Sequence, residues 1–180
     1  MLSLLPDYAD PVRLCVLGKR YEGTLQLMDL PRLVPLLTST EGEAAFVLAF
    51  STDSDRRHVV EVQVSATLLV QCQRCLGPMP IDVDARALLG IVGGPNEAER
   101  LAEDLDPLLV EDGRLALRSL IEDELILAVP PAPMHDPEAC EVRLDEMVDN
   151  GKEGQSQPDA ERENPFAALA KLRDDLNKED

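Results

Sequence analysis

The chain has 180 residues, of which 35 are acidic and 17 basic, so its formal net charge is −18. This length suits one domain with an appendage, and the hydrophobic content of 44% is enough for a core. Such a charge disfavours a protein that wraps nucleic acid, because those proteins present a face of Lys and Arg. A basic protein partner is easier to reconcile with it, although acidity alone also keeps proteins soluble.

Composition also restricts the compartment. No segment approaches the ~18–20 apolar residues that span a bilayer. The first seven residues, MLSLLPD, lack the charged region and apolar core of a secretory signal. Four cysteines in an unexported chain favour metal or redox chemistry over structural disulfides. We therefore expect a cytoplasmic protein that makes no membrane contact.

The N-terminal third contains weak signals. Alternation of Val12, Leu14 and Val16 with polar neighbours predicts a short hairpin over residues 11–25. Residues 29–38 predict a short helix that begins at Asp29, since Asp is a good N-cap and Pro is tolerated in a first turn.

The middle of the chain contains the clearest strands. Residues 44–51 and 59–71 predict two strands around a polar turn, and residues 81–86 predict a third. In residues 60–68 and 81–86, apolar and polar side chains alternate, which gives these strands one buried and one wet face. Cys72 and Cys75 then lie at the tip of a hairpin between two long antiparallel strands.

The next elements alternate between short and long. Residues 96–105 predict a charged helical excursion, and residues 107–110 predict a short strand. Residues 115–129 predict the clearest helix, which must end at Pro130 because Pro cannot continue a helix.

One face of that helix carries an acid. The predicted buried stripe comprises Leu117, Leu120, Ile121, Glu124 and Ala128. A buried carboxylate needs a partner, and we expect Arg74 or Arg118 to provide it.

The C-terminal region differs in composition. Residues 149–163 have almost nothing to bury and predict a disordered acidic linker. Residues 164–180 predict an amphipathic helix with Phe166, Leu169, Leu172 and Leu176 on one stripe. Such a short helix is marginal alone, so it either completes the domain core or docks on a partner. We favour docking through Phe166, Leu169 and Leu172.

The fold class that follows is α+β. We expect residues 1–148 to form one domain: an antiparallel, barrel-like sheet over residues 11–92, covered by the helix of residues 115–129. The acidic tail and its terminal helix follow this domain.

Four residues predict a metal site. Cys72 and Cys75 form a C-x2-C pair, and His135 and Cys140 form an H-x4-C pair far downstream. A tetrahedral zinc ion needs four such nitrogen or sulfur ligands, and a four-ligand site is structural. The alternative is a reduced cysteine hairpin without metal.

Other chemistries fit less well. A thioredoxin-like motif lies at a helix N-terminus, whereas this pair precedes Gly77, Pro78 and a strand. A nuclease is disfavoured, because no ordered region of the sequence has a carboxylate cluster with metal-site spacing. Common hydrolase and nucleotide-binding motifs are also absent from the sequence. We expect a protein that is not an enzyme. Arg74 has two interpretations. It contacts a phosphate or a partner at the hairpin tip, or it offsets the charge of the two thiolates or forms a salt bridge with Glu122 or Glu124.

Several sequence blocks together resemble the YceD family, the large ribosomal RNA subunit accumulation proteins of bacteria and plastids. The blocks are, in chain order, residues 72–76 (CQRCL), residues 121–130 (IEDELILAVP), His135 with Cys140, and residues 164–169 (NPFAAL). Some relatives have further cysteines where this chain has His135 and Cys140.

The resemblance implies a cytoplasmic factor for the synthesis, processing or stability of large-subunit 23S ribosomal RNA. Its partners would be the large-subunit precursor, a basic ribosomal protein or an rRNA-processing factor. Direct RNA contact would be local, through Arg56, Arg57 and Arg74. The alternative function is a small zinc- or thiol-based redox sensor.

Overall fold

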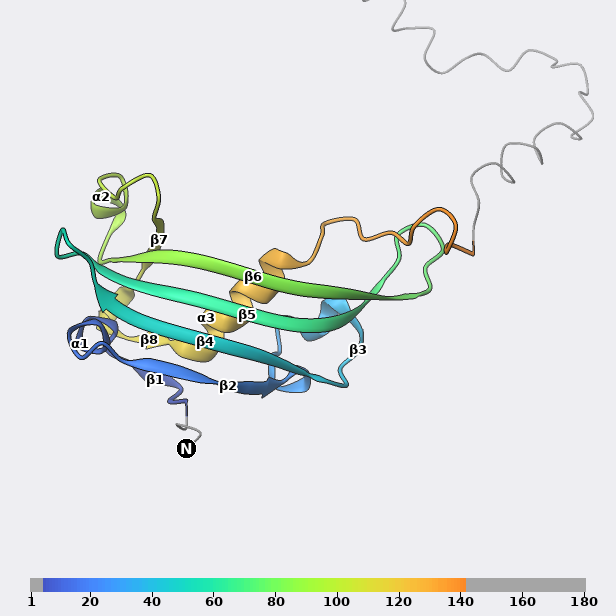
Figure 1. Cartoon of the computed structure of the whole chain (residues 1–180), viewed down its shortest axis with the longest axis horizontal. Helices are drawn as coiled ribbons and strands as arrows, with labels where there is room; N and C mark the ends of the chain where they lie inside the picture. Colours follow the sequence, from blue (N-terminus) through green and yellow to red (C-terminus); the bar gives the residue numbers. More distant parts are fainter. Residues whose placement is uncertain (1–4, 142–180) are drawn as a thin grey trace, which may run out of the picture. The chain divides into compact units, whose positions relative to one another are not determined.

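The computed structural model describes residues 5–141. These residues form a mixed α+β unit in which one long helix covers one face of a curved sheet (Figure 1). The helices, with their bounds, are α1 (Pro11–Val16), α2 (Pro95–Ala98) and α3 (Leu117–Ala128), and the short 3-10 turns are η1 (Leu27–Asp29), η2 (Val34–Leu36) and η3 (Glu111–Gly113). The strands are β1 (Tyr8–Ala9), β2 (Arg20–Gln26), β3 (Leu37–Ser39), β4 (Glu43–Thr52), β5 (His58–Gln71), β6 (Pro78–Val92), β7 (Asp106–Leu109) and β8 (Leu115–Ala116).

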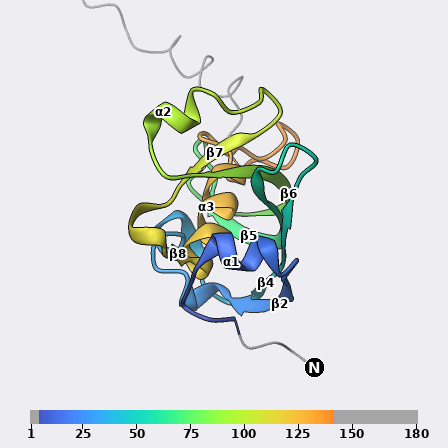
Figure 2. The same cartoon turned by 90° about the vertical axis from the view of Figure 1, so that its left-hand side faces the viewer.

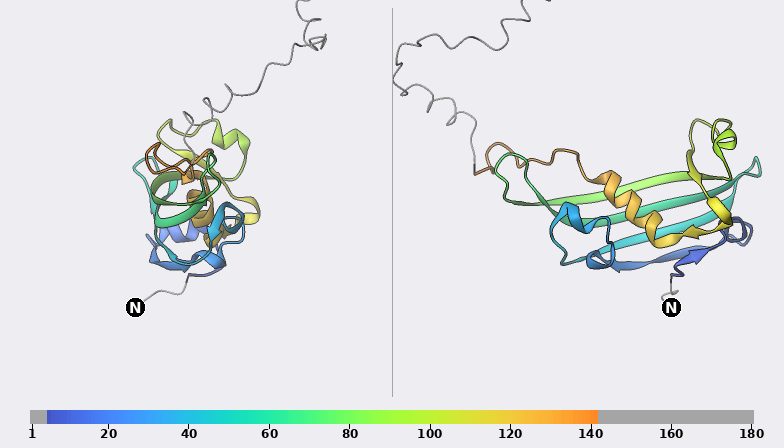
Figure 3. Two further views of the ribbon diagram at one scale, coloured as in Figure 1. Left: turned by 90° about the vertical axis from the view of Figure 1, so that its right-hand side faces the viewer. Right: turned by 180° about the vertical axis from the view of Figure 1, so that it is seen from behind.

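The main sheet is open. Its strand order is β2-β4-β5-β6-β7, and β3 pairs with β5 beyond the end of β4. Neither β2 nor β7 has a second neighbour within residues 5–141, so the predicted barrel is wrong. The physical reason is that α3 lies inside the curve of the sheet, where a barrel would place facing strands (Figures 2 and 3).

The sheet is also not wholly antiparallel. β7 runs parallel to β6, with Leu89 opposite Asp106 and Val92 opposite Leu109. A parallel pair needs a connection of a dozen residues or more, and residues 93–105 with α2 provide it. The predicted helical excursion is reduced to the single turn of α2.

The three central strands confirm the predictions from alternation. β5 buries Val60, Val62, Val64 and Leu68 on one face, and its pairing with β6 runs without a bulge from Val59–Gly90 to Gln71–Pro78. The core that includes this face and α3 is mostly aliphatic, with Tyr21, Phe46 and Phe50 as its aromatic members.

The predicted N-terminal hairpin is wrong. Residues 11–16 form α1, which Asp10 caps by accepting a hydrogen bond from the Arg13 backbone N–H at 3.1 Å. Its buried residues are Pro11, Leu14 and Cys15, which have helical spacing. The predicted helix at residues 29–38 is also wrong, because the chain there forms η1, η2 and β3 around Pro35.

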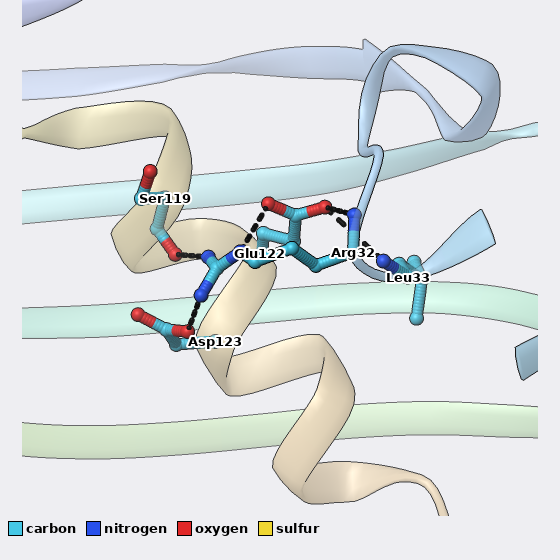
Figure 4. Close-up of polar contacts among 5 residues, drawn as sticks. All are labelled: Arg32, Leu33, Ser119, Glu122 and Asp123. Atoms are coloured by element: carbon cyan, nitrogen blue, oxygen red, sulfur yellow. Dashed lines mark hydrogen bonds and ion pairs between the residues drawn. The ribbon is translucent and has the colours of Figure 1, made fainter. Parts of the chain in front are cut away.

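The buried acid of α3 differs from the prediction. Glu122 is 3% exposed, whereas Glu124 is only half-buried. Glu122 accepts backbone N–H bonds from Arg32 at 2.6 Å and Leu33 at 3.1 Å, and a guanidinium bond from Arg32 at 3.0 Å (Figure 4). Neither Arg74 nor Arg118 pairs with it; Arg32 provides the charge.

The same guanidinium group continues the network along the helix. Arg32 also binds the Asp123 carboxylate at 2.6 Å and the Ser119 carbonyl at 2.9 Å (Figure 4). The segment between η1 and η2 is therefore attached to the first turns of α3 by five hydrogen bonds. The buried carboxylate accepts the Arg32 backbone N–H and shares the Leu33 N–H with the Leu30 carbonyl, so its own oxygens are paired.

The remaining predicted elements fall outside this description. The linker at residues 149–163 and the helix at residues 164–180 lie beyond the described residues and stay predictions. Within residues 5–141, no helix has the length and apolarity that a membrane span requires.

The network predicts unequal costs for two neighbouring acids. Glu122→Ala leaves the Arg32 backbone N–H without its acceptor and removes one acceptor each from the Leu33 N–H and the Arg32 guanidinium group. It should lower the free energy of unfolding by about 2–4 kcal/mol. Asp123→Ala removes a half-exposed partner of the same arginine and should cost less than about 1 kcal/mol. Urea denaturation of both full-length variants measures the difference. Equal losses would contradict the role assigned to Glu122.

Candidate metal centre

The turn between β5 and β6 brings two thiols together. The Cys72 backbone N–H donates to the Gly77 carbonyl at 2.9 Å, and the Leu76 N–H donates to the Cys72 carbonyl at 2.9 Å. This tight turn places Leu76 in the left-handed region, with φ of 61°. Cys72 and Cys75 both lie on it, so their side chains point to one place.

The segment after α3 lies over this turn. The helix ends at Ala128, and Pro130 and Pro131 prevent its continuation. The buried Pro133 accepts a hydrogen bond from the Gln73 N–H at 2.8 Å. This contact places the next residues of the segment, including His135, beside the cysteine turn.

Four potential ligands converge there. The ligand atoms of Cys72, Cys75, His135 and Cys140 all lie within 4.8 Å of one another. The Cys75 Sγ lies 3.4 Å from the His135 Nδ1. Tetrahedral zinc–thiolate geometry has sulfur–sulfur edges of about 3.8 Å, so small side-chain adjustments would bring all four to one ion. The arrangement could hold a metal ion, and its three sulfurs and one imidazole are ligands that zinc prefers.

Backbone groups favour a thiolate at Cys72. Burial opposes its ionisation, but N–H groups of Cys75, His135 and Arg74 point at the sulfur and together lower the pKa of Cys72 to about 6. The His135 and Arg74 nitrogens lie 3.4 and 3.5 Å from it. Hydrogen bonds to a charged form stabilise that form, and the thiolate is the form that binds a metal.

The second cysteine has the opposite shift. The Gly77 N–H lowers the pKa of Cys75, but burial and the neighbouring Cys72 and Cys140 thiols outweigh it, and the pKa is raised. Adjacent thiols resist simultaneous ionisation because like charges repel. A bound metal ion would supply the positive charge that stabilises several neighbouring thiolates.

The predicted site residues have different outcomes. The two cysteine pairs, distant in sequence, lie together. Arg74 is half-buried and makes no ion pair with Glu122 or Glu124; its backbone N–H contacts the Cys72 sulfur instead. Phe166, Leu169 and Leu172 lie outside the described residues. Metal and partner binding by these residues stay predictions.

Two features of this end of the sheet were missed from sequence. Leu76 is 63% exposed at the tip of the turn, and no composition signal marks its left-handed backbone. A hollow of about 210 Å³ lies beside the turn. Its lining has no charged side chain and comprises Pro35, Leu36, Val70, Gln71, Gln73, Val129, Pro130, Pro131 and Pro133. Such a lining suits apolar or amide groups rather than phosphate.

Comparison with known proteins identifies the family of this chain. The model of one family, the large ribosomal RNA subunit accumulation protein YceD, matches residues 60–173. A relative from Haemophilus influenzae with that same name is 31% identical over 170 residues, which are 94% of this chain and 96% of the relative. The chain belongs to the YceD family. No solved structure matches it.

The YceD match includes most of the parts described above. It begins in β5 and includes the cysteine turn, α3, His135 and Cys140, and it extends past Phe166. The resemblance stated from the sequence blocks is confirmed. β2, β3 and β4 precede the family match but fall within the length aligned to the H. influenzae protein, since that alignment covers 94% of the chain.

The turn geometry predicts opposite effects of two Leu→Gly substitutions. Leu76→Gly removes a side chain that disfavours the left-handed conformation, and should raise the free energy of unfolding by up to about 1 kcal/mol. Leu109→Gly, at a 48% exposed position of β7, should lower it by about 1 kcal/mol. Thermal or urea unfolding of both variants provides the test. Destabilisation by both would show that Leu76 is not strained.

Proposed function

We propose that this chain acts in the accumulation of large-subunit 23S ribosomal RNA, as a cytoplasmic, non-enzymatic assembly factor. The observation that carries the proposal is the family membership, with an alignment along 94% of the chain to a protein named for that role. Factors of this kind affect rRNA synthesis, processing or stability through contacts with the assembling particle. The large-subunit precursor is therefore the proposed destination.

Charge favours a protein partner over naked RNA. The net charge is −18, and several arginines are neutralised internally. Arg57 binds Asp53 and Asp55, and Arg86 binds Glu61. Of the arginines suggested for RNA contact, only Arg56 and Arg74 lack an ion pair within residues 5–141, which is too little for a phosphate-binding face. We propose a basic ribosomal protein or processing factor as the direct partner.

The metal centre would have a structural role. We propose that Cys72, Cys75, His135 and Cys140 hold a zinc ion, supported by their mutual distances and the thiolate character of Cys72. Zinc bound by four protein ligands cross-links them and leaves no position for a reacting water. Here the link would hold the segment after α3 on the β5–β6 turn.

Partner contacts are proposed at two places. Arg74 and the exposed Leu76 lie on the cysteine turn, where a metal cross-link would keep them rigid. Phe166, Leu169 and Leu172 lie within the C-terminal segment, where the sequence predicts an amphipathic stripe. The YceD match includes both places.

A thiol-based redox sensor is the second candidate. The pKa of Cys72, lowered to about 6, favours it because the thiolate is the reactive form. Burial opposes it, since Cys72 is 0% and Cys140 5% exposed and buried thiols react slowly. A mild peroxide treatment followed by mass spectrometry of the thiols separates the candidates: early oxidation of Cys72 would favour the sensor.

The assembly proposal predicts an rRNA phenotype. Deletion of the gene should lower the ratio of large- to small-subunit rRNA, and the full chain expressed in trans should restore it. A chain that ends at Val148 should restore less, if the C-terminal contacts are needed. Quantitative electrophoresis or sequencing of total rRNA measures the ratio. A normal ratio after deletion would contradict the proposed function.

The zinc proposal predicts a metal content of about one ion per chain. Atomic emission on the purified full-length protein measures it. Cys72→Ser and Cys140→Ser should each lose nearly all bound zinc. Cys15→Ala is the matched control, because Cys15 is a buried cysteine whose sulfur contacts the Val59 carbonyl at 3.4 Å, away from the cluster. Unchanged zinc in the two serine variants would exclude this ligand set.

A further inference from the structure

The outer edge of β6 is open along most of its length. β6 pairs with β5 from Pro78 to Gly90, but on its other side only Leu89–Val92 pair with β7. Within residues 5–141, no hydrogen bond reaches the backbone N–H and C=O groups on the outer edge of β6 between Pro80 and Leu88. Figure 1 shows β6 as the outermost long strand, with α2 and β7 at one end and the cysteine turn at the other. The chain that follows α3 passes on the outer side of β6 toward the cysteine-turn end (Figures 1 and 3).

The bonding pattern identifies which backbone groups point outward. The Phe50 N–H donates to the Lys19 carbonyl at 2.9 Å, so these opposed residues form a hydrogen-bonded pair. Bonded and non-bonded pairs alternate along an antiparallel ladder, and each residue bonds to only one side. Followed through the registers of β4, β5 and β6, this alternation directs the even-numbered residues of β6 away from β5.

Two independent features agree with this alternation. The carbonyl of Val92, an even-numbered residue, accepts a bond from the Val110 N–H at 2.9 Å on the outer side. Pro78 and Pro80 are also even-numbered, and Pro lacks the N–H that an inward-facing residue would donate to β5. The outward groups of the open stretch are therefore those of Asp82, Asp84, Arg86 and Leu88.

Both ends of this stretch are closed. At one end, Pro78 and Pro80 have no backbone N–H to donate to an added strand. At the other end the Leu101 side chain lies over Gly90, so closely that a Cβ there would be 2.7 Å from it. We call residues 82–88 the edge window. At about 3.4 Å per residue it is about 20 Å long, the length of an ordinary strand.

The side chains of the edge window give it a negative charge. Asp82 and Asp84 are exposed, and neither forms an ion pair within the described part of the chain. The Asp82 carboxylate accepts a hydrogen bond from the Thr67 hydroxyl at 2.7 Å, which leaves its charge in place. Arg86 does not offset them, because it binds Glu61 on the neighbouring strand. Cross-strand neighbours of opposite charge stabilise a sheet, so a strand placed beside the window would favour Lys or Arg opposite the two aspartates.

The face of the window that is turned to the core carries small apolar side chains. Val83 is buried, and Ala85 and Ala87 are half-buried against the core. An added strand with alternating basic and apolar residues would match both faces of the window.

We propose that the edge window accepts an extended segment of a basic protein, which adds a strand to the sheet beside β6. Strand addition uses the free backbone groups for affinity and the alternate side chains for specificity. A second copy of this chain is a poorer occupant, because two molecules of charge −18 repel each other. That the basic protein belongs to the assembling large subunit rests on the proposed function; the window itself does not.

Amide hydrogen exchange on the full-length protein tests the window directly. In the free protein, the even-numbered amides of residues 82–88 should exchange at least about 100-fold faster than the odd-numbered ones, which bond to β5. The probe is an octapeptide of alternating Lys and Val. Its addition should slow the even-numbered amides by about tenfold or more and leave the odd-numbered ones unchanged. An octapeptide of alternating Glu and Val is the charge control.

Two proline variants provide a matched comparison. Asp84→Pro removes an outward N–H, as the native Pro78 and Pro80 do, and should weaken the Lys-Val peptide about tenfold. Thr24→Pro removes an outward N–H from β2, the opposite edge of the sheet, and should change the affinity less than about twofold. Asp84→Lys keeps the backbone and tests charge alone, so it serves if Asp84→Pro does not fold; it should also weaken the peptide.

Several results would overturn the proposal. They are equal protection of odd and even amides in the free protein, peptide binding without protection of the even amides, and equal effects of Asp84→Pro and Thr24→Pro. Protection that rises with protein concentration alone would assign the window to self-association instead. If the window binds the peptide but deletion of the gene leaves the rRNA ratio normal, the proposed function is contradicted and the inference about the window is supported. If deletion lowers the ratio but the window does not bind the peptide, only the inference about the window is contradicted.

Discussion

The antiparallel pairing of β5 with β6 is the constraint on which the rest of this structure depends. It runs without interruption from Val59–Gly90 to Gln71–Pro78. β-branched residues such as Val60, Val62 and Val64 suit a half-buried pleated surface. The pairing creates the face that α3 covers, and it extends past β4 to place the cysteine turn at its far end. It also leaves β6 with a second edge, which β7 only partly occupies.

The hydrogen bonds between Arg32 and Glu122 fix the segment between η1 and η2 against α3. Through them, this irregular segment is bonded to α3 rather than to the sheet. Since α3 leads directly into the segment that contains His135, the orientation of the helix also decides where that side chain arrives. A buried carboxylate is a costly way to hold a loop, but here it satisfies two main-chain donors at once.

Sequence reasoning worked where the signal was local and repeated. Alternation located β5 and β6, because it reflects backbone geometry over many neighbouring residues. Pro130 located the end of α3, because Pro cannot continue a helix. It failed at residues 11–16, where the Asp10 cap outweighed a short alternation. It also assigned the buried acid to Glu124 instead of Glu122, because the choice depends on Arg32, which is distant in sequence. The parallel pairing of β7 is equally non-local.

The candidate metal centre joins residues that the chain produces at different times. Cys72 and Cys75 belong to a hairpin that can form from neighbouring residues alone, whereas His135 and Cys140 follow only after β7 and α3. During synthesis, Cys72 and Cys75 therefore leave the ribosome before His135 and Cys140, and until then the two thiols lack these neighbours. Because His135 and Cys140 follow α3 in the chain, the four groups come together only in a domain in which the β5–β6 turn and the segment after α3 are both in place.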